Sequence, residues 1–213
     1  MASTANSKNK SQDELPIILF EKPSDWSSWL EENGAQASGI WLRLAKKASG
    51  ISSITYAEAV EVALCHGWID GLKRSYDESS WIQKFTPRRP KSIWSKINRS
   101  KVEALMASGQ MRPAGLAEVE RAKQDGRWDA AYDSYSTAAV PDDFEAALEN
   151  SPEAKSFFAT LNSTNRYAIL FRIQTAKKPE TRAKRIQEFV RMLEQHEVLY
   201  PSTGSSPRGK KGE

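Results

Sequence analysis

A pair of strand-like segments near the middle of the chain limits the available folds more than any other feature. Residues 68–76 and 81–85 are rich in aromatic and β-branched side chains, and the polar turn 77–79 joins them. This pattern predicts a β-hairpin. Shorter strand signals precede it at 17–20 and 40–46, with helix signals between them. The predicted order is therefore β-α-β-α-β-β. Because the strands of a hairpin are antiparallel, we expect an α+β fold with a small, mostly antiparallel sheet packed by helices.

Capping residues predict where the helices begin. Ser24 is expected to cap the first helix, because a Ser side chain accepts a hydrogen bond from the free amides of the first turn. Thr55 and Glu58 have the spacing of a capping box at the start of the second helix, and Ser100 and Glu103 repeat that spacing further along. These positions place one helix before each of the second and third strands, and further helices after the hairpin.

From residue 92 onward the pattern is helical, and we expect the sheet domain to be followed by an all-helical C-terminal region. A linker-like stretch of small and polar residues lies at 131–140. Both ends of the chain are polar and lack a hydrophobic pattern, which predicts disorder. The predicted organisation is a disordered tail at 1–14, an α+β domain at 15–130, the linker at 131–140, a helical region at 141–200 and a second tail at 201–213.

Composition excludes several classes of protein. The chain has a single cysteine and two histidines, which rules out an intramolecular disulfide and argues against a metal site, so we predict no metal and no cofactor. No apolar run approaches the roughly 20 residues that cross a bilayer, and the N-terminus lacks the apolar core of a signal peptide. We expect a cytoplasmic protein, with the nucleus as the alternative.

Residues 79–102 carry seven basic side chains and no acid, although the whole chain has a net charge of only +4. Arg88, Arg89 and Lys91 lie in a segment bracketed by prolines, where a stiff backbone can hold cations outward for contact with phosphate or carboxylate. Trp94 follows closely and can stack on a planar group. The pattern predicts an anion site, whereas the alternative is a core of aromatic rings beneath solvated charges.

The segment 67–71 places Trp68 and Asp70 between two glycines. Glycine permits close approach of a ligand, and Asp70 can act as an acid, a base or a partner for arginine. The structural alternative is a helix end, a buried tryptophan and an aspartate that caps a turn. A pairing of Asp70 with Arg88 or Arg89 satisfies both interpretations, and we take it as the local hypothesis.

Cys65 and His66 are neighbours in the chain. Adjacent side chains of a helix point about 100° apart, so the two would face each other only if the helix breaks there. Cysteine is commonly a small buried hydrophobe. We therefore interpret His66 as a residue that lines a pocket, and Cys65 as structural.

A second basic cluster lies near the end of the predicted helical region. Over residues 177–191, six Lys and Arg side chains oppose Glu180 and Glu188. They fall mostly on the polar face of the last predicted helix, which is typical of a solvated surface. The alternative is docking of nucleic acid or of an acidic protein.

Several motifs resemble the YdeI/OmpD-associated, or bacteriocin-protection, family. They include Tyr-Ala-Glu-Ala at 56–59, Cys-His-Gly-Trp-Ile-Asp-Gly at 65–71, the run 85–98, Met-Arg-Pro-Ala-Gly at 111–115 and the segment 176–182. The resemblance extends over residues 17–196 in collinear order. It implies a soluble protein linked to protection against bacteriocins or antimicrobial peptides and to association with an outer-membrane porin. It transfers no catalytic residue.

The resemblance implies a stress or antimicrobial-peptide-protection protein, and the basic-aromatic segment predicts that it binds an anionic ligand or an acidic partner. We expect that it catalyses no reaction. No phosphate-binding glycine loop or nucleophile elbow is present to favour an enzyme. The predicted ligand-binding residues are His66, Trp68, Asp70, Arg88, Arg89, Lys91 and Trp94. Two alternatives stay open, a nucleic-acid-binding module and an enzyme that uses His66 and Asp70. The oligomeric state is not predicted.

Overall fold

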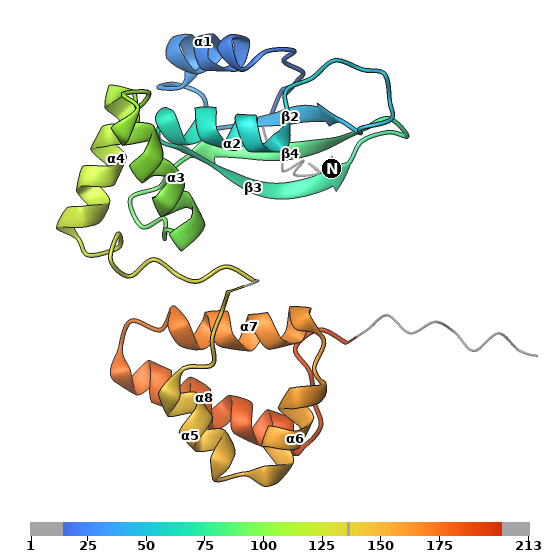
Figure 1. The fold of residues 1–213 in the computed structure, drawn as a ribbon, viewed down its shortest axis with the longest axis vertical. Coiled ribbons are helices and arrows are strands. Elements are labelled where there is room, and N and C mark those ends of the chain that lie inside the picture. The colour runs from blue at the N-terminus through green and yellow to red at the C-terminus, as the bar shows by residue number, and fades with distance from the viewer. Residues whose placement is uncertain (1–14, 136, 202–213) are drawn as a thin grey trace, which may run out of the picture. The chain divides into compact units, whose positions relative to one another are not determined.

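The structure is a computed structural model that describes residues 15–135 and 137–201. Most of the two predicted tails therefore lies outside the described residues. The chain divides into two compact units (Figure 1), an N-terminal one of Met1–Trp94 and Asn98–Ala130 and a C-terminal one of Ser95–Ile97 and Ala131–Glu213.

The N-terminal unit contains a four-stranded sheet in the order β1-β2-β4-β3. Its strands are β1 (Ile17–Ile18), β2 (Ile40–Ala45), β3 (Trp68–Ser75) and β4 (Ser80–Pro87). β1 runs parallel to β2, while β2 pairs with β4 and β4 with β3 in antiparallel fashion. The predicted hairpin, the α+β class and the order β-α-β-α-β-β are confirmed.

Helices α1 (Pro23–Asn33) and α2 (Tyr56–Cys65) cover one face of this sheet. Ile40, Leu42 and Leu44 alternate along β2 and are almost fully buried on that face. Trp26 of α1 is also completely buried, and its indole N–H donates to the carbonyl of Ala59 in α2 at 3.2 Å. The strand period of two and the helix period of 3.6 thus turn apolar residues from three elements toward one core.

Two further helices of the N-terminal half follow the hairpin, α3 (Lys96–Ala107) and α4 (Pro113–Gln124). The start of α4 lies against the end of α2, because the backbone N–H of Arg112 donates to the carbonyl of Cys65 at 3.0 Å. A Cβ atom on Gly115 would lie 2.2 Å from the same carbonyl oxygen. Glycine is therefore required at residue 115 for the two helices to approach this closely.

The described part of the C-terminal unit is helical, as the sequence predicts. Its helices are α5 (Asp142–Glu149), α6 (Pro152–Thr160), α7 (Ser163–Gln174) and α8 (Pro179–Glu194). Phe144, Ile169, Ile173 and Leu193 are fully buried where these helices meet. Ser151 caps α6 by accepting a hydrogen bond from the N–H of Ala154 at 3.4 Å. The arrangement is a small helical bundle with its own core.

Two predicted helix starts are wrong. α1 begins at Pro23 with Lys22 as the capping position, so Ser24 lies inside the helix and caps nothing. Proline is favoured at the first helical position because it has no N–H to satisfy there. Ser100 lies within α3, which already begins at Lys96. The capping box of Thr55 and Glu58 is confirmed in both of its hydrogen bonds.

Candidate functional site

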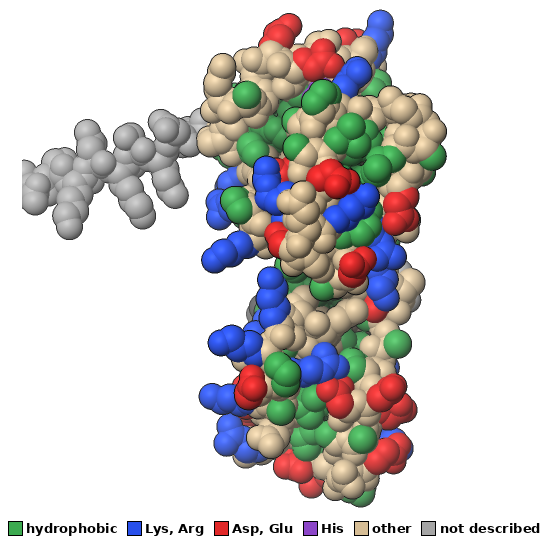
Figure 2. Space-filling view, turned by 90° about the vertical axis from the view of Figure 1, so that its left-hand side faces the viewer, with side chains coloured by type: hydrophobic (Ala, Val, Ile, Leu, Met, Phe, Trp, Pro, Cys, Tyr) green, Lys and Arg blue, Asp and Glu red, His purple; other side chains and the backbone are tan. Residues whose placement is uncertain are grey.

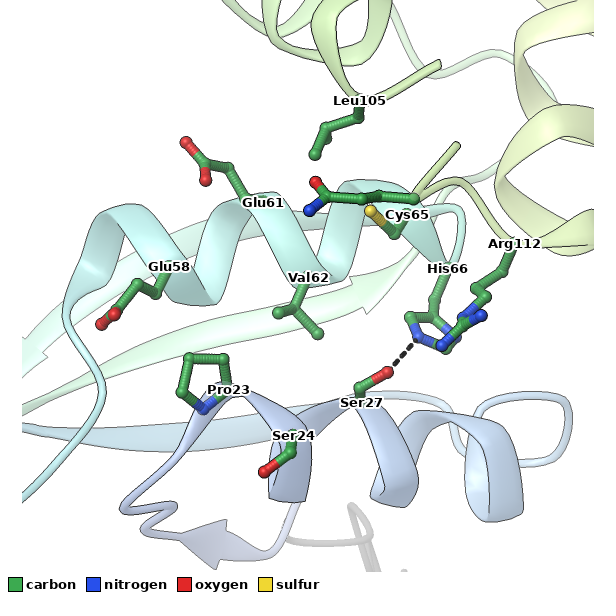
Figure 3. A pocket seen from close by; sticks show the side chains of 11 residues that line it. Pro23, Ser24, Ser27, Glu58, Glu61, Val62, Cys65, His66, Leu105 and Arg112 are labelled. Carbon is green, nitrogen blue, oxygen red and sulfur yellow. Dashed lines mark hydrogen bonds between the residues drawn. The ribbon is translucent and has the colours of Figure 1, made fainter. Parts of the chain in front are cut away.

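A cavity of about 340 Å³ lies between α1 and α2 in the N-terminal unit (Figure 3). The end of α3 and the connection from α3 to α4 complete its wall. Its lining residues are Pro23, Ser24, Ser27, Glu58, Glu61, Val62, Cys65, His66, Leu105, Gln110 and Arg112. This volume lies at the lower end of the range for small-molecule sites, which is roughly 300–1,000 Å³.

The sequence of α2 explains why the helix serves both the core and the cavity. Glu58, Glu61, Val62 and Cys65 recur at helical spacing and form one stripe along the cavity. The other stripe consists of Ala59, Val60, Ala63 and Leu64, which are buried against the sheet. The capping box at Thr55 fixes where the helix begins and therefore which residues fall on each stripe.

His66 occupies the C-terminal end of α2 and is 8% exposed. Its ring Nε2 lies 3.0 Å from the hydroxyl oxygen of Ser27 in α1, a hydrogen bond that joins the two helices across the cavity. Burial lowers the pKa of His66 below its ordinary value of 6.5; the carboxylate of Glu31 opposes this shift and Arg112 adds to it. The imidazole is therefore uncharged at neutral pH, and it can donate a hydrogen bond to a ligand or accept one from it.

The lowered pKa of His66 predicts a specific acid dependence of stability. The unfolded chain takes up a proton below pH of about 6.5, whereas the folded protein resists it. The contribution of His66 to the free energy of unfolding should therefore be fully present above that pH. It should fall as pH is lowered toward the folded-state pKa. Thermal melts across this pH range should show that His66→Asn removes the fall. His196→Asn, at an exposed position, is the control and should retain it; an equal effect of both variants would contradict the assignment.

The two ends of the cavity carry opposite charges. At one end the carboxylate of Glu61 pairs with Lys101 at 2.5 Å, and Glu58 folds back onto its capping partner Thr55, which lowers the pKa of its carboxyl. At the other end Arg112 lies 3.2 Å from Glu31. Figure 3 shows Glu58 and Arg112 at opposite ends, with Pro23 and Val62 between them. The site can therefore bind groups of both signs.

Cys65 lines the cavity as a free thiol and is 8% exposed. Burial raises the pKa of its thiol, an effect that Arg112 partly opposes and Glu61 reinforces. A thiol with a raised pKa is a poor nucleophile at neutral pH. His66 hydrogen-bonds Ser27, which argues for the structural interpretation of Cys65.

Of the seven predicted ligand-binding residues, His66 lines this cavity. Trp68 is 2% exposed and belongs to the core, with its ring centroid 6.0 Å from that of Trp26. Asp70 accepts a hydrogen bond from the hydroxyl of Tyr56 at 2.6 Å, and burial together with this carboxylate raises the pKa of Tyr56. The printed side-chain partner of Asp70 is Tyr56, and the local hypothesis of an Asp70–Arg88 or Asp70–Arg89 pair stays a prediction.

The four remaining predicted residues fall into two groups. Arg88 is 5% exposed and its guanidinium lies 3.5 Å from the ring centroid of the buried Trp94. Arg89 and Lys91 are exposed on the loop after β4. A stacked and buried arginine beside two solvated cations is a structural arrangement. The other six predicted residues lie outside the cavity, and their role in ligand binding stays a prediction.

Sequence reasoning missed Ser27, Gln110 and Arg112. Ser24 and Ser27 have the spacing of one helix face, which is a signal for a polar stripe on α1. No sequence signal connects that stripe to His66, which lies 39 residues further along the chain. Arg112 belongs to a motif of the family resemblance, but its place in the cavity follows from the contact of α4 with α2.

Comparison with protein families divides the chain much as its fold does. Residues 18–118, which include every lining residue of the cavity, match the family described as Domain of unknown function (DUF8412). Residues 137–196 match the family described as Bacteriocin-protection, YdeI or OmpD-Associated. The suspected resemblance is thus confirmed over residues 137–196, which comprise the helices of the C-terminal unit. The motifs between 56 and 115 lie in the segment that matches the other family. No curated protein and no solved structure matches the chain.

Within 15–135 and 137–201, no helix combines the length and the apolar character needed to cross a membrane. The same part of the chain contains no group of three or more His, Cys, Asp or Glu side chains arranged to hold a metal ion.

Proposed function

We propose that the protein is a non-enzymatic protection protein that holds a short peptide in the cavity between α1 and α2. The observation that carries this proposal is a cavity whose middle is lined by the apolar side chains of Pro23 and Val62, with carboxylates at one end and a guanidinium at the other. A peptide with a free amino and a free carboxyl terminus has the same two charges, separated by an apolar body. The bacteriocin-protection segment supports a protective role, because the agents to be neutralised are themselves peptides.

The carboxylate end would bind the ammonium group of the peptide. Glu61 and its partner Lys101 have side chains that are 45% and 31% exposed, and ion pairs in such positions contribute little to stability. A carboxylate accepts several hydrogen bonds at once. Glu61 can therefore accept from a ligand ammonium while it still contacts Lys101.

The guanidinium end would bind the carboxylate of the peptide. Arg112 and Glu31 are each about half exposed, so a ligand carboxylate can replace Glu31 at low cost and accept two parallel hydrogen bonds. Gln110 and the hydrogen-bonded pair of Ser27 and His66 offer further polar groups there. The anionic group that the sequence led us to expect would be bound by Arg112 in place of Arg88 and Arg89.

The length of the cavity sets the size of the peptide. Glu58 and His66 are eight residues apart on α2, which corresponds to about 12 Å at 1.5 Å per helical residue. An extended peptide spans roughly 3.3 Å per residue, so about four residues reach from one end to the other. The cavity would therefore recognise a peptide terminus or a short fragment rather than a folded protein.

Calorimetric titration with a peptide of about four apolar residues tests the proposal. Acetylating its amino terminus should weaken binding to the wild type, as should amidating its carboxyl terminus. Loss of one charged hydrogen bond corresponds to roughly a tenfold to hundredfold weaker Kd. The affinity of Arg112→Gln should not change when the peptide is amidated, but should fall when it is acetylated. Glu61→Gln should show the reverse pattern.

The matched control is the double variant Arg89→Gln with Lys91→Gln, which removes exposed cations outside the cavity. It should bind the peptide as the wild type does. If this variant lost binding and Arg112→Gln did not, the basic loop after β4 would be the site and the cavity proposal would be overturned.

A second candidate, a peptidase or esterase, has one observation in its favour. A serine hydroxyl 3.0 Å from an uncharged imidazole, as in Ser27 and His66, is the contact that activates a nucleophile in acyl transfer. Asp70, which the sequence suggested as its partner, does not line the cavity. Mass spectrometry of the peptide after incubation distinguishes the two functions: binding leaves it intact, whereas cleavage that Ser27→Ala abolishes would establish the enzyme.

A further inference from the structure

A second hollow lies on α7, within the C-terminal unit, and the proposed function does not use it. It has a volume of about 480 Å³. Its lining residues are Tyr135, Thr164, Tyr167, Ala168, Phe171, Arg172 and Tyr200. Five of these follow helical spacing along one face of α7, while Tyr135 and Tyr200 come from the chain segments before and after the bundle. We refer to this hollow as the aromatic groove.

The rings of the aromatic groove form a connected row. The ring centroid of Tyr167 lies 5.3 Å from that of Tyr135 and 5.8 Å from that of Phe171. Tyr135 is 50% exposed and Tyr200 is 49% exposed. Large aromatic side chains are usually turned into a core. Half-exposed rings on both edges of one groove therefore form a platform that the packing of the bundle does not require.

Arg172 is the one charged residue among the described lining residues of the groove, and none of them is acidic. Arg172 is held in place because it donates to the carbonyl of Ala168 at 2.9 Å and to the hydroxyl of Tyr200 at 3.2 Å. Arg185 of α8, which does not line the groove, donates to the backbone carbonyl of Arg172. These contacts fix the two guanidinium groups without neutralising their charge.

The charge of the C-terminal unit is divided between its helices. From 163 to 194, the stretch of α7 and α8, eight Lys and Arg side chains oppose three Glu side chains. α5 and α6 carry five acidic residues, at 142, 143, 145, 149 and 153. Figure 2 shows Lys and Arg side chains gathered toward one edge of this unit, and most of its Asp and Glu side chains toward the other. The groove lies on α7, one of the two helices with a net positive charge, and its partner should be an anion.

We propose that the aromatic groove binds single-stranded nucleic acid. Exposed aromatic rings beside fixed arginines are the combination that stacks bases and follows a phosphate backbone without reading sequence. An acidic protein would match the charge but would not need the row of rings. A proline-rich peptide would match the rings but would not need the cations. The proposal assigns the nucleic-acid alternative, which the sequence raised for the basic cluster at 177–191, to the neighbouring helix α7.

Fluorescence anisotropy with a short fluorescein-labelled oligothymidylate tests this proposal on the full chain. The double variant Tyr135→Ala with Tyr200→Ala should bind at least about fivefold more weakly, because stacking on an aromatic side chain is worth that much or more per base. Arg172→Gln should bind more weakly and should reduce the slope of log K against log salt by about 0.7, the value for one phosphate contact on a single strand.

Two control variants remove an exposed ring and an exposed cation that lie outside the groove. Tyr76→Ala removes a ring that is 48% exposed in the N-terminal unit, and Arg191→Ala removes an exposed cation of α8. Tyr76→Ala should leave the affinity unchanged, and Arg191→Ala should change it less than Arg172→Gln does. Thermal melts establish that each variant is folded.

Three results would overturn the proposal. The first is that the wild type shows no salt-dependent binding of the oligonucleotide. The second is that the double tyrosine variant binds as well as the wild type or Tyr76→Ala. The third is that duplex DNA binds as tightly as the single strand, which would indicate a general attraction to phosphate without stacking.

Discussion

Gly115→Ala is expected to destabilise the N-terminal unit by about 3 kcal/mol, the upper end of the usual cost of overpacking. The added Cβ would lie 2.2 Å from the carbonyl oxygen of Cys65 and 2.9 Å from that of Leu64. Both neighbours are backbone atoms at the end of α2, so no flexible side chain can move aside. α4 must shift away from α2, which also strains the hydrogen bond from the N–H of Arg112 to Cys65.

Chemical denaturation of the variant and of a matched control measures this cost. Gly71→Ala adds the same methyl group in β3, where its nearest contact would be an ordinary 3.8 Å, and it should change the free energy of unfolding by less than about 0.5 kcal/mol. Gly115→Ala should also weaken peptide binding, because Arg112 is displaced together with α4. Equal stability of the two variants would contradict the close packing of α4 on α2.

The sheet and the helical C-terminal region could be predicted because their signals are local. Ile40, Leu42 and Leu44 alternate with half-buried residues along β2, and a period of two has no other regular interpretation. The polar turn between β3 and β4 likewise specifies a hairpin. Thr55 and Glu58 cap α2 through bonds that span only three residues. In these elements the deciding contacts lie within a few residues, and pattern and structure agree.

Helix starts were harder to predict where two local signals compete. At α1, Pro23 and Ser24 are both favoured near a helix start, and the structure places the proline at the first helical position. At α3, the spacing of Ser100 and Glu103 suggests a cap, but Glu103 lies 3.6 Å from Arg99 one turn earlier in a continuous helix. A capping box and an ion pair one turn apart use the same residue types, so spacing alone does not separate them.

The candidate site depends on contacts that the sequence does not encode locally. The cavity is assembled from residues between 23 and 112, and His66 meets Ser27 across two helices. The cluster at 79–102 was predicted to converge on an anion. Arg88 is instead buried against Trp94, whose ring centroid also lies 5.0 Å from that of Trp128. Trp128 lies outside the window that suggested the site, so the packing around Trp94 cannot be read from that window.

Binding of the peptide should shield Cys65 from alkylation, and we expect this to be the largest effect on any single side chain. Cys65 is the only cysteine of the chain and lines the cavity between Glu61 and His66. Burial raises the pKa of its thiol, so at a given pH it carries less thiolate than an unstructured cysteine. Because the thiolate is the reacting form, the rate with iodoacetamide should be slow at neutral pH and should rise as pH is increased.

The rate of this alkylation with and without the peptide tests the central claim, that the cavity between α1 and α2 is the binding site. At a peptide concentration of about 100 times Kd, only about 1% of the protein is free, so complete shielding slows the reaction by up to about a hundredfold. A peptide blocked at both termini, which should bind weakly, should leave the rate unchanged. If the free peptide saturates the protein by calorimetry while Cys65 reacts at its original rate, the peptide binds elsewhere and the account is contradicted.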